Sequence, residues 1–143
     1  MLISTKGRYA MRVMIDLAEH MSDGFIPLKA IAQRQDISEK YLESIIKLLV
    51  RARLLSGQRG KGGGYRLTRP PEAYTAREIL ELTEACLAPV ACLEPGAGPC
   101  PSAAYCRTLP LWRGLDRVIT EYLNGVSLAD LMQKTAPGND YVI

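Results

Sequence analysis

Apolar residues recur at the spacing of an amphipathic helix three times within the first fifty positions of the chain. Ser4 or Thr5 is placed to cap the first helix, which should end within His20–Gly24. Pro27 suits the first turn of the second helix, and Ser38 is placed to cap the third. The residues predicted to face the core are Tyr9, Ala10, Val13, Met14, Leu17, Ala18, Leu28, Ile31, Ala32, Leu42, Ile45, Ile46 and Leu49.

Two short strands and a glycine-rich turn follow the third helix. The strands are predicted at Leu54–Ser56 and Tyr65–Thr68, and the four glycines Gly60 and Gly62–Gly64 between them allow positive φ and close backbone approach. Two basic side chains, Arg59 and Lys61, lie on the turn. A basic, glycine-rich hairpin after two helices joined by a tight turn is typical of a winged helix, so the pattern predicts DNA binding.

The hairpin has two other interpretations. A nucleotide-hydrolase phosphate loop needs a Ser or Thr after its lysine and a helix after the loop. Lys61 is instead followed by Gly62 and then by a strand, which argues against that motif. A plain surface turn with incidental charges is the remaining alternative.

The polar face of the third helix supplies candidates for reading the major groove. Glu43 differs from the others because a carboxylate repels phosphate and gains only by accepting from a cytosine amino group. The alternative for each residue is a solvated helix face, and for Tyr41 an aromatic at the core edge. The candidates are Ser38, Lys40, Tyr41, Glu43 and Ser44.

Four further basic residues are candidates for contacts outside the major groove. Arg59 at the hairpin tip fits a narrow minor groove, where the negative potential is strongest. Lys6, Arg8 and Lys61 are predicted to touch phosphates, which position a protein without reading sequence.

The second half of the chain predicts two helices around an irregular segment. A short helix capped by Thr75 should run from Ala76 to about Glu84, and a longer one from Leu109 or Pro110 to Asn124. Gly125 should stop the longer helix, and Ser127 should cap a last short helix that ends at Leu131. The broad apolar face of the longer helix predicts packing on a second copy, with an intrachain core helix as the alternative.

Charge divides the chain in the same place. Residues 1–74 carry a net charge of +6 and residues 75–143 a net charge of −3, so the basic half is the one with the hairpin. No apolar run of about 18 residues and no export leader is present, which predicts a cytoplasmic protein without membrane insertion. No Ser/His/Asp set, useful carboxylate pair or cofactor fingerprint is found, so the chain is not expected to be an enzyme.

All four cysteines fall within a 21-residue window rich in Pro and Gly. The gaps between Cys86, Cys92, Cys100 and Cys106 are five, seven and five residues, so no CxxC pair occurs. Thiolates on a loop that can wrap around a ligand suit an iron–sulfur cluster. Zinc binding, thiol oxidation sensing and inert buried thiols remain open alternatives.

Five segments together resemble the IscR/NsrR/CymR family of bacterial winged-helix transcriptional regulators, over nearly the whole chain. The resemblance implies a mainly α fold with a small β-hairpin: a winged helix-turn-helix DNA-binding part (1–74), a short helix and cysteine-bearing sensor loop (75–108), and a dimerisation helix with a C-terminal tail (109–143). The segments are Leu2–Ala10, Ile37–Glu43, Arg59–Tyr65, Cys106 with Leu111-Trp112, and Leu123–Leu128.

The resemblance also implies a homodimer on a double-stranded DNA operator and a cluster held by Cys92, Cys100 and Cys106, [2Fe–2S] in preference to [4Fe–4S]. Leu109 stands where cluster-assembly regulators have a histidine ligand, so the fourth ligand is open. Cys86 is a candidate by proximity, and solvent, a small thiol or a carboxylate such as Glu84 or Glu94 are the alternatives. The alternative function is a cluster-free repressor controlled by cysteine oxidation or by a partner enzyme of cysteine metabolism. The tail Asp140–Ile143, similar to that of the cysteine-metabolism members, favours this alternative.

Overall fold

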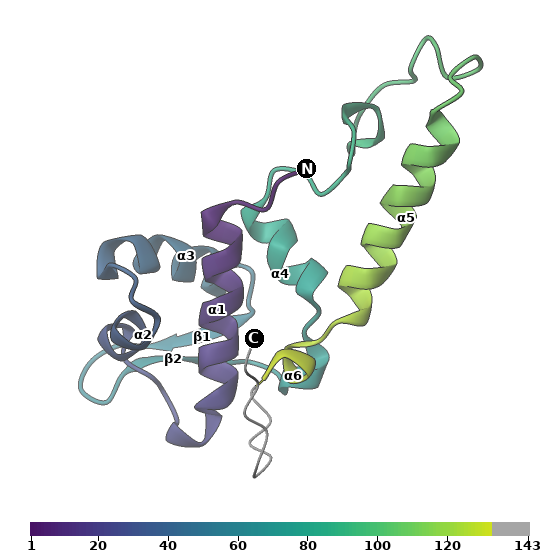
Figure 1. The fold of residues 1–143 in the computed structure, drawn as a ribbon. Helices are drawn as coiled ribbons and strands as arrows, with labels where there is room; N and C mark the ends of the chain where they lie inside the picture. The colour runs from purple at the N-terminus through teal and green to yellow at the C-terminus, as the bar shows by residue number, and fades with distance from the viewer. Residues whose placement is uncertain (133–143) are drawn as a thin grey trace.

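The computed structural model describes residues 1–132, so the tail Asp140–Ile143 lies outside the described part of the chain. The described part of the chain is mainly helical and contains one small hairpin, which lies at one edge of the molecule (Figure 1). In order the elements are α1 (Thr5–Glu19), η1 (Met21–Asp23), α2 (Leu28–Gln35), α3 (Glu39–Arg51), β1 (Leu55–Gln58), β2 (Gly64–Leu67), η2 (Pro71–Ala73), α4 (Ala76–Thr83), η3 (Ala91–Leu93), α5 (Leu109–Gly125) and α6 (Leu128–Leu131). None of these described helices is long and apolar enough to cross a membrane.

Side-chain caps define where four of the helices begin. Ser4 accepts a hydrogen bond from the third residue after it, and Ser38, Thr75 and Ser127 do the same for α3, α4 and α6. Each bond satisfies a backbone N–H that the first helical turn leaves without a partner. The predicted caps are therefore confirmed.

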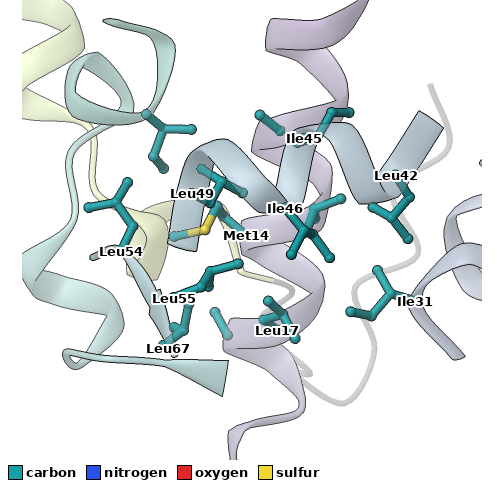
Figure 2. Close-up of a cluster of buried hydrophobic side chains, with 14 of the residues drawn as sticks. Met14, Leu17, Ile31, Leu42, Ile45, Ile46, Leu49, Leu54, Leu55 and Leu67 are labelled. Carbon is teal, nitrogen blue, oxygen red and sulfur yellow. The ribbon is translucent and has the colours of Figure 1, made fainter. Parts of the chain in front are cut away.

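One hydrophobic core joins α1, α2, α3, the hairpin, α4 and α6. Figure 2 shows side chains from α1 and α3 meeting those of the hairpin. The side chain of Leu128 in α6 is fully buried in the same core, and its N–H donates to the Tyr74 carbonyl at 3.1 Å. Ala76 N–H also donates to the Val126 carbonyl at 2.8 Å. These two bonds fasten the chain just after α5 to the segment at the start of α4.

The hairpin is antiparallel and lies one or two residues away from the predicted strands. Leu55 pairs with Leu67 and Gln58 with Gly64, so β1 extends through Gly57 and Gln58 and leaves out Leu54. The backbone of Ile26 adds a bridge: its N–H and C=O exchange bonds of 2.8 Å with Tyr65. The boundaries differ because pairing with a distant segment, not local composition, decides where the strands begin and end.

Helix α5 leans along α4 and has no buried residue. It includes Gly125, so the predicted stop falls one residue too early. The apolar face was predicted to pack on a second copy or, alternatively, within one core. In the single chain one side, with Trp112, Ile119 and Leu123, is half-buried, while the neighbouring side stays exposed.

Asp16 of α1 is the one charged side chain in the buried set of the described residues. Arg34 donates two hydrogen bonds to its carboxylate, at 2.9 and 2.7 Å, and Gln35 donates a third at 2.9 Å. Burial alone would raise the pKa of Asp16, but the bonds from Arg34 and Gln35 outweigh burial and hold the pKa below its ordinary value. Asp16 therefore ties α1 to α2 as an anion.

Asp16→Asn should destabilise the fold by about 2 kcal/mol at neutral pH, because the charge-assisted bonds are removed. A carboxyl whose pKa is lowered by folding stabilises the fold fully at pH values above its pKa in the unfolded chain. This stabilisation is lost as the pH falls through its pKa in the folded protein. The difference between the two proteins in urea unfolding should thus shrink below about pH 4. Asp36→Asn, at an exposed left-handed position that suits Asn, is the matched control. A difference that is constant with pH would contradict the assignment.

Candidate DNA interface and cysteine loop

The N-terminal half of α3 presents a row of polar side chains. Ser38 Oγ accepts from the Tyr41 N–H at 3.2 Å, and Ser44 Oγ donates to the Tyr41 carbonyl at 2.6 Å. Lys40 and Glu43 are exposed, and Glu43 pairs with Lys47 at 3.2 Å. All five predicted groove-reading residues therefore lie within two turns of one helix. Ser38 and Ser44 already make local bonds there.

Tyr41 is half-buried because α1 packs against it. The rings of Tyr9 and Tyr41 meet edge to face with centroids 5.8 Å apart, and the Arg12 guanidinium lies 5.0 Å from the Tyr9 ring centroid. Arg12 also donates to the side chain and the backbone carbonyl of Gln35. The position of α3 is consequently fixed through α1 and the end of α2.

Glycines shape the hairpin tip that carries Arg59 and Lys61. Gly60 and Gly62 have φ of 90° and 76°, and Gly63 N–H donates to the Gly60 carbonyl at 3.0 Å. Gly64 has φ of 148°, and a Cβ there would lie 2.2 Å from the Ile26 carbonyl oxygen. The backbone thus passes too close to Ile26 for any side chain at position 64. Arg59 and Lys61 are both exposed on this fixed turn.

The two predicted phosphate contacts on α1 lie elsewhere. Lys6 and Arg8 belong to the first turns of α1, which Figure 1 places beside α4 and away from the hairpin. Arg8 donates to Thr5 Oγ1 at 3.0 Å. The structure gathers the α3 residues together but does not bring Lys6 and Arg8 to the hairpin.

A groove of about 400 Å³ separates α3 from the hairpin. Its apolar floor is Ile46, Val50 and Tyr65. Its rim contains Lys47, Arg51, Gly57, Gln58 and Arg59. Lys47, Arg51 and Gln58 were not among the predicted functional residues. The available signal was the spacing of Glu43, Lys47 and Arg51, which places them on one side of α3.

The four cysteines are all free thiols on the segment between α4 and α5. Cys92 and Cys100 are exposed, and Cys86 and Cys106 are half-buried. Within residues 1–132 no three His, Cys, Asp or Glu side chains are gathered as a metal site. The donor chemistry of the loop suits an iron–sulfur cluster, since thiolates are its usual protein ligands. The loop would have to draw its thiols together to hold one.

Two of these thiols receive local hydrogen bonds. The Ala88 N–H donates to Cys86 Sγ at 3.2 Å. Cys106 Sγ lies 3.5 Å from Thr108 Oγ1, and bonds from the side chain and backbone of Thr108 lower the pKa of the Cys106 thiol. Both contacts favour the deprotonated form of Cys106, which is the form of a cysteine that binds metal.

The N-terminal end of the cysteine segment is hydrogen-bonded to the start of α1. Glu84 follows α4, and its Oε1 accepts from Ser4 N–H at 3.1 Å and from Ser4 Oγ at 2.7 Å. A Cβ at Gly7 would lie 2.1 Å from the same oxygen. A carboxylate at this position also interacts favourably with the helix N-terminus. Sequence reasoning did not find this contact, because Ser4 and Glu84 are 80 positions apart.

A helix-turn-helix whose second helix stands beside a basic, glycine-shaped hairpin defines a winged helix-turn-helix DNA-binding protein. The predicted fold class is confirmed. The family described as "Rrf2: Iron-dependent Transcriptional regulator" matches residues 3–134, and the chain belongs to this family.

Relatives and solved structures agree with this assignment. The HTH-type transcriptional regulator IscR of Aliivibrio salmonicida (strain LFI1238) is 37% identical over 132 residues, which are 92% of this chain and 77% of the relative. The structure of CymR (YrzC), the global cysteine regulator of B. subtilis, has a TM-score of 0.74 and 37% identity and covers 92% of this chain and 95% of its own. That of T. potens IscR has a TM-score of 0.72 and 34% identity, with coverage of 92% and 85%.

The suspected resemblance to the IscR/NsrR/CymR family is therefore confirmed. The matching family and the Aliivibrio salmonicida relative are named as transcriptional regulators, and CymR as a regulator, so the prediction that the chain is not an enzyme is confirmed as well. The chain is a DNA-binding transcriptional regulator.

Proposed function

We propose that the chain is a homodimeric regulator whose binding to a DNA operator depends on an iron–sulfur cluster held by Cys92, Cys100 and Cys106, with [2Fe–2S] preferred over [4Fe–4S]. The observation that carries the proposal is a loop of free thiols rooted at Glu84, which is bonded directly to the first helix of the DNA-binding part. The family's description as iron-dependent supports the choice of metal. In this proposal residues 1–74 bind DNA, residues 75–108 hold the cluster and residues 109–143 form the dimer.

The exposed stripe of α5 supports a homodimer. Leu111, Leu115, Val118 and Tyr122 leave 60, 41, 58 and 69% of their surface exposed. They are spaced by four, three and four residues, which places them on one side of the helix. A contiguous apolar stripe is stabilised by covering it, and an identical stripe on a second copy is its natural complement.

The operator contacts follow from this dimer. Two copies of α3 would enter successive major grooves, about 34–36 Å apart, with the hairpins in the flanking minor grooves. Lys40, Tyr41 and Glu43, with Ser38 and Ser44 of the same face, would face base edges. Arg59 would enter the minor groove, and Lys61 would contact phosphate. Lys6 and Arg8, away from the hairpin, would contact phosphate only where the DNA extends along α1.

A bound cluster supplies a redox-active, acid-labile centre that demands thiolate ligands. The residues of this chain supply the response. Cys106 lies at the start of α5, and Cys92 and Cys100 lie on the segment that begins beside Glu84. Gathering these thiols would move the segment between two fixed points, the Glu84–Ser4 contact and α5. The result would be a shift in the equilibrium between a state that binds DNA tightly and one that binds it weakly. The size of the shift is limited by the difference between the two states in affinity for the cluster.

Protein purified without oxygen should show visible absorption bands and contain iron and sulfide in equal amounts. Cys92→Ser, Cys100→Ser and Cys106→Ser should each lower the iron content several-fold, because each removes a ligand. Cys86→Ser is the matched variant: retained iron excludes Cys86 as the fourth ligand, and a fall in iron assigns it. Operator affinity of loaded and cluster-free protein, compared at fixed salt, completes the test. Colourless protein that reconstitution leaves unchanged would contradict the cluster.

A second candidate function is a cluster-free repressor controlled by cysteine oxidation or by a partner enzyme of cysteine metabolism. The observation that favours it is the similarity to CymR, a structure described as that of a global cysteine regulator. The separated thiols of residues 1–132 fit this function without rearrangement. Iron-free protein whose operator affinity changes with thiol oxidant would establish it.

A further inference from the structure

One strand of the DNA backbone must pass between α3 and the hairpin if the proposed function is correct. An α-helix in the major groove and a hairpin tip in the adjacent minor groove lie on opposite sides of one sugar-phosphate strand. Side chains in the gap between the two elements therefore face phosphates rather than base edges. In this chain the gap is the groove of about 400 Å³ between α3 and the hairpin.

The charges around this groove suit a polyanion. Lys47, Arg51 and Arg59 stand on its rim, and none of the Asp and Glu residues in the described part of the chain lines it. All three side chains are exposed. Arg51 lies one turn after Lys47 on α3, so the two cations follow the helix along the groove. The amide of Gln58 on β1 supplies a neutral hydrogen-bond donor from the opposite wall.

Lys47 has a competing partner that matters for base reading. Its Nζ lies 3.2 Å from Glu43 Oε1, and both side chains are largely exposed, at 70 and 51%. An exposed pair of this kind contributes little to stability, so a phosphate can displace the carboxylate. The exchange would leave the Glu43 carboxylate free to accept from a cytosine amino group.

We infer that Lys47 and Arg51 form a site for backbone phosphates between the two reading elements, and that engagement of Lys47 by phosphate releases Glu43 for the bases. This site rests on the proposed DNA-binding mode. It adds two residues to the DNA contacts, and it explains why an acidic side chain can stand on a helix that faces DNA. Arg51 contributes affinity without sequence preference, whereas Lys47 links phosphate binding to base reading.

The test measures affinity against salt concentration for the full-length dimer, by fluorescence anisotropy. The probes are a random-sequence duplex of about three helical turns and an operator selected from a random pool by the wild-type protein. Removing one cation that neutralises a phosphate reduces the slope of log K against log salt by about 0.9. Arg51→Ala should therefore reduce the slope by about two per dimer and weaken both duplexes alike, roughly tenfold.

Three further variants complete the test. Arg51→Lys should keep most of the slope, because a point charge suffices for phosphate. Lys47→Ala should reduce the slope as Arg51→Ala does. It should also change the preference between operators that differ only at the cytosine that Glu43 is proposed to contact. Arg113→Ala, an exposed arginine of α5, removes the same charge away from the groove and should change neither quantity.

The possible failures are distinguishable. If the wild-type protein binds neither duplex, the proposed DNA-binding mode itself is wrong. If it binds with a steep slope and the groove variants behave like Arg113→Ala, the phosphate site is wrong and the DNA-binding mode stands. Weakening confined to the selected operator would make Arg51 a base-reading residue, which also overturns the inference.

Discussion

Replacing Gly64 with alanine should remove the hairpin as a DNA-binding element. Gly64 has φ of 148°, and a Cβ would lie 2.2 Å from the Ile26 carbonyl oxygen and 2.7 Å from the Pro27 nitrogen. Both neighbours are backbone, so neither can move without breaking the Ile26–Tyr65 bridge. We expect a loss of about 3 kcal/mol in urea unfolding, from backbone strain and the broken bridge together. Operator binding should fall below detection in the same preparation.

Gly60→Ala is the matched control for this prediction. Gly60 also has positive φ, at 90°, but no atom lies within 4 Å of the position that a Cβ would take. Its substitution should cost only the backbone preference, roughly 1–2 kcal/mol, and should leave the Ile26–Tyr65 bridge intact. Equal effects at Gly60 and Gly64 would show that the close approach to Ile26 does not matter.

Val118→Glu should convert the proposed dimer into monomers. Val118 lies within the exposed stripe of α5, with 58% of its surface accessible in the single chain. A carboxylate there would be buried opposite its own copy, two like charges in an apolar interface. Sedimentation analysis should find monomer at micromolar concentration. Affinity for an operator with two half-sites should fall by about 10²- to 10⁴-fold, because the second half-site no longer binds intramolecularly.

Arg117→Glu is the control, because Arg117 precedes Val118 and faces away from the stripe on the same helix. This variant should remain dimeric. Unfolding of the isolated chain should be the same for both variants, since neither side chain is buried within it. If the Val118→Glu protein remains dimeric, the dimer interface does not lie on this stripe of α5.

The helices were predictable because their signals are local. Ser4, Ser38, Thr75 and Ser127 each lie three residues before the N–H that they cap, and the apolar spacing identifies the inward face without knowledge of the fold. The strand ends were missed by one or two residues because Gly64 and Tyr65 are positioned by Ile26, which is far away in sequence. Gly125 belongs to α5 and is not among the glycines with positive φ, so it does not form the left-handed cap on which the predicted stop depended.

The candidate site was only partly predictable for the same reason. The α3 face and the hairpin tip follow from local pattern, and the family was identified from motifs that the comparisons confirm. Predicting that Arg51 lies on the rim of the groove requires knowledge of how α3 and the hairpin are positioned relative to each other. The Glu84–Ser4 bond, across 80 positions, requires the whole fold. Neither feature has a sequence signature that distinguishes it from an ordinary polar surface.

The C-terminal part of α5 is held at two places, at Val126–Leu128 and at Thr120, which accepts a hydrogen bond of 2.9 Å from Arg77 of α4. The two backbone bonds and the buried Leu128 side chain fix this end against Tyr74 and α4. The other end leads directly into the cysteine segment, and Figure 1 shows it extending beyond the rest of the molecule. From Leu109 to Thr120 the projecting part of α5 spans 12 residues, about 18 Å at the rise of an α-helix. A rotation of about 5° about Thr120 corresponds to a displacement of only about 1.6 Å at Leu109, so a small rearrangement near Cys106 is enough to change the orientation of α5.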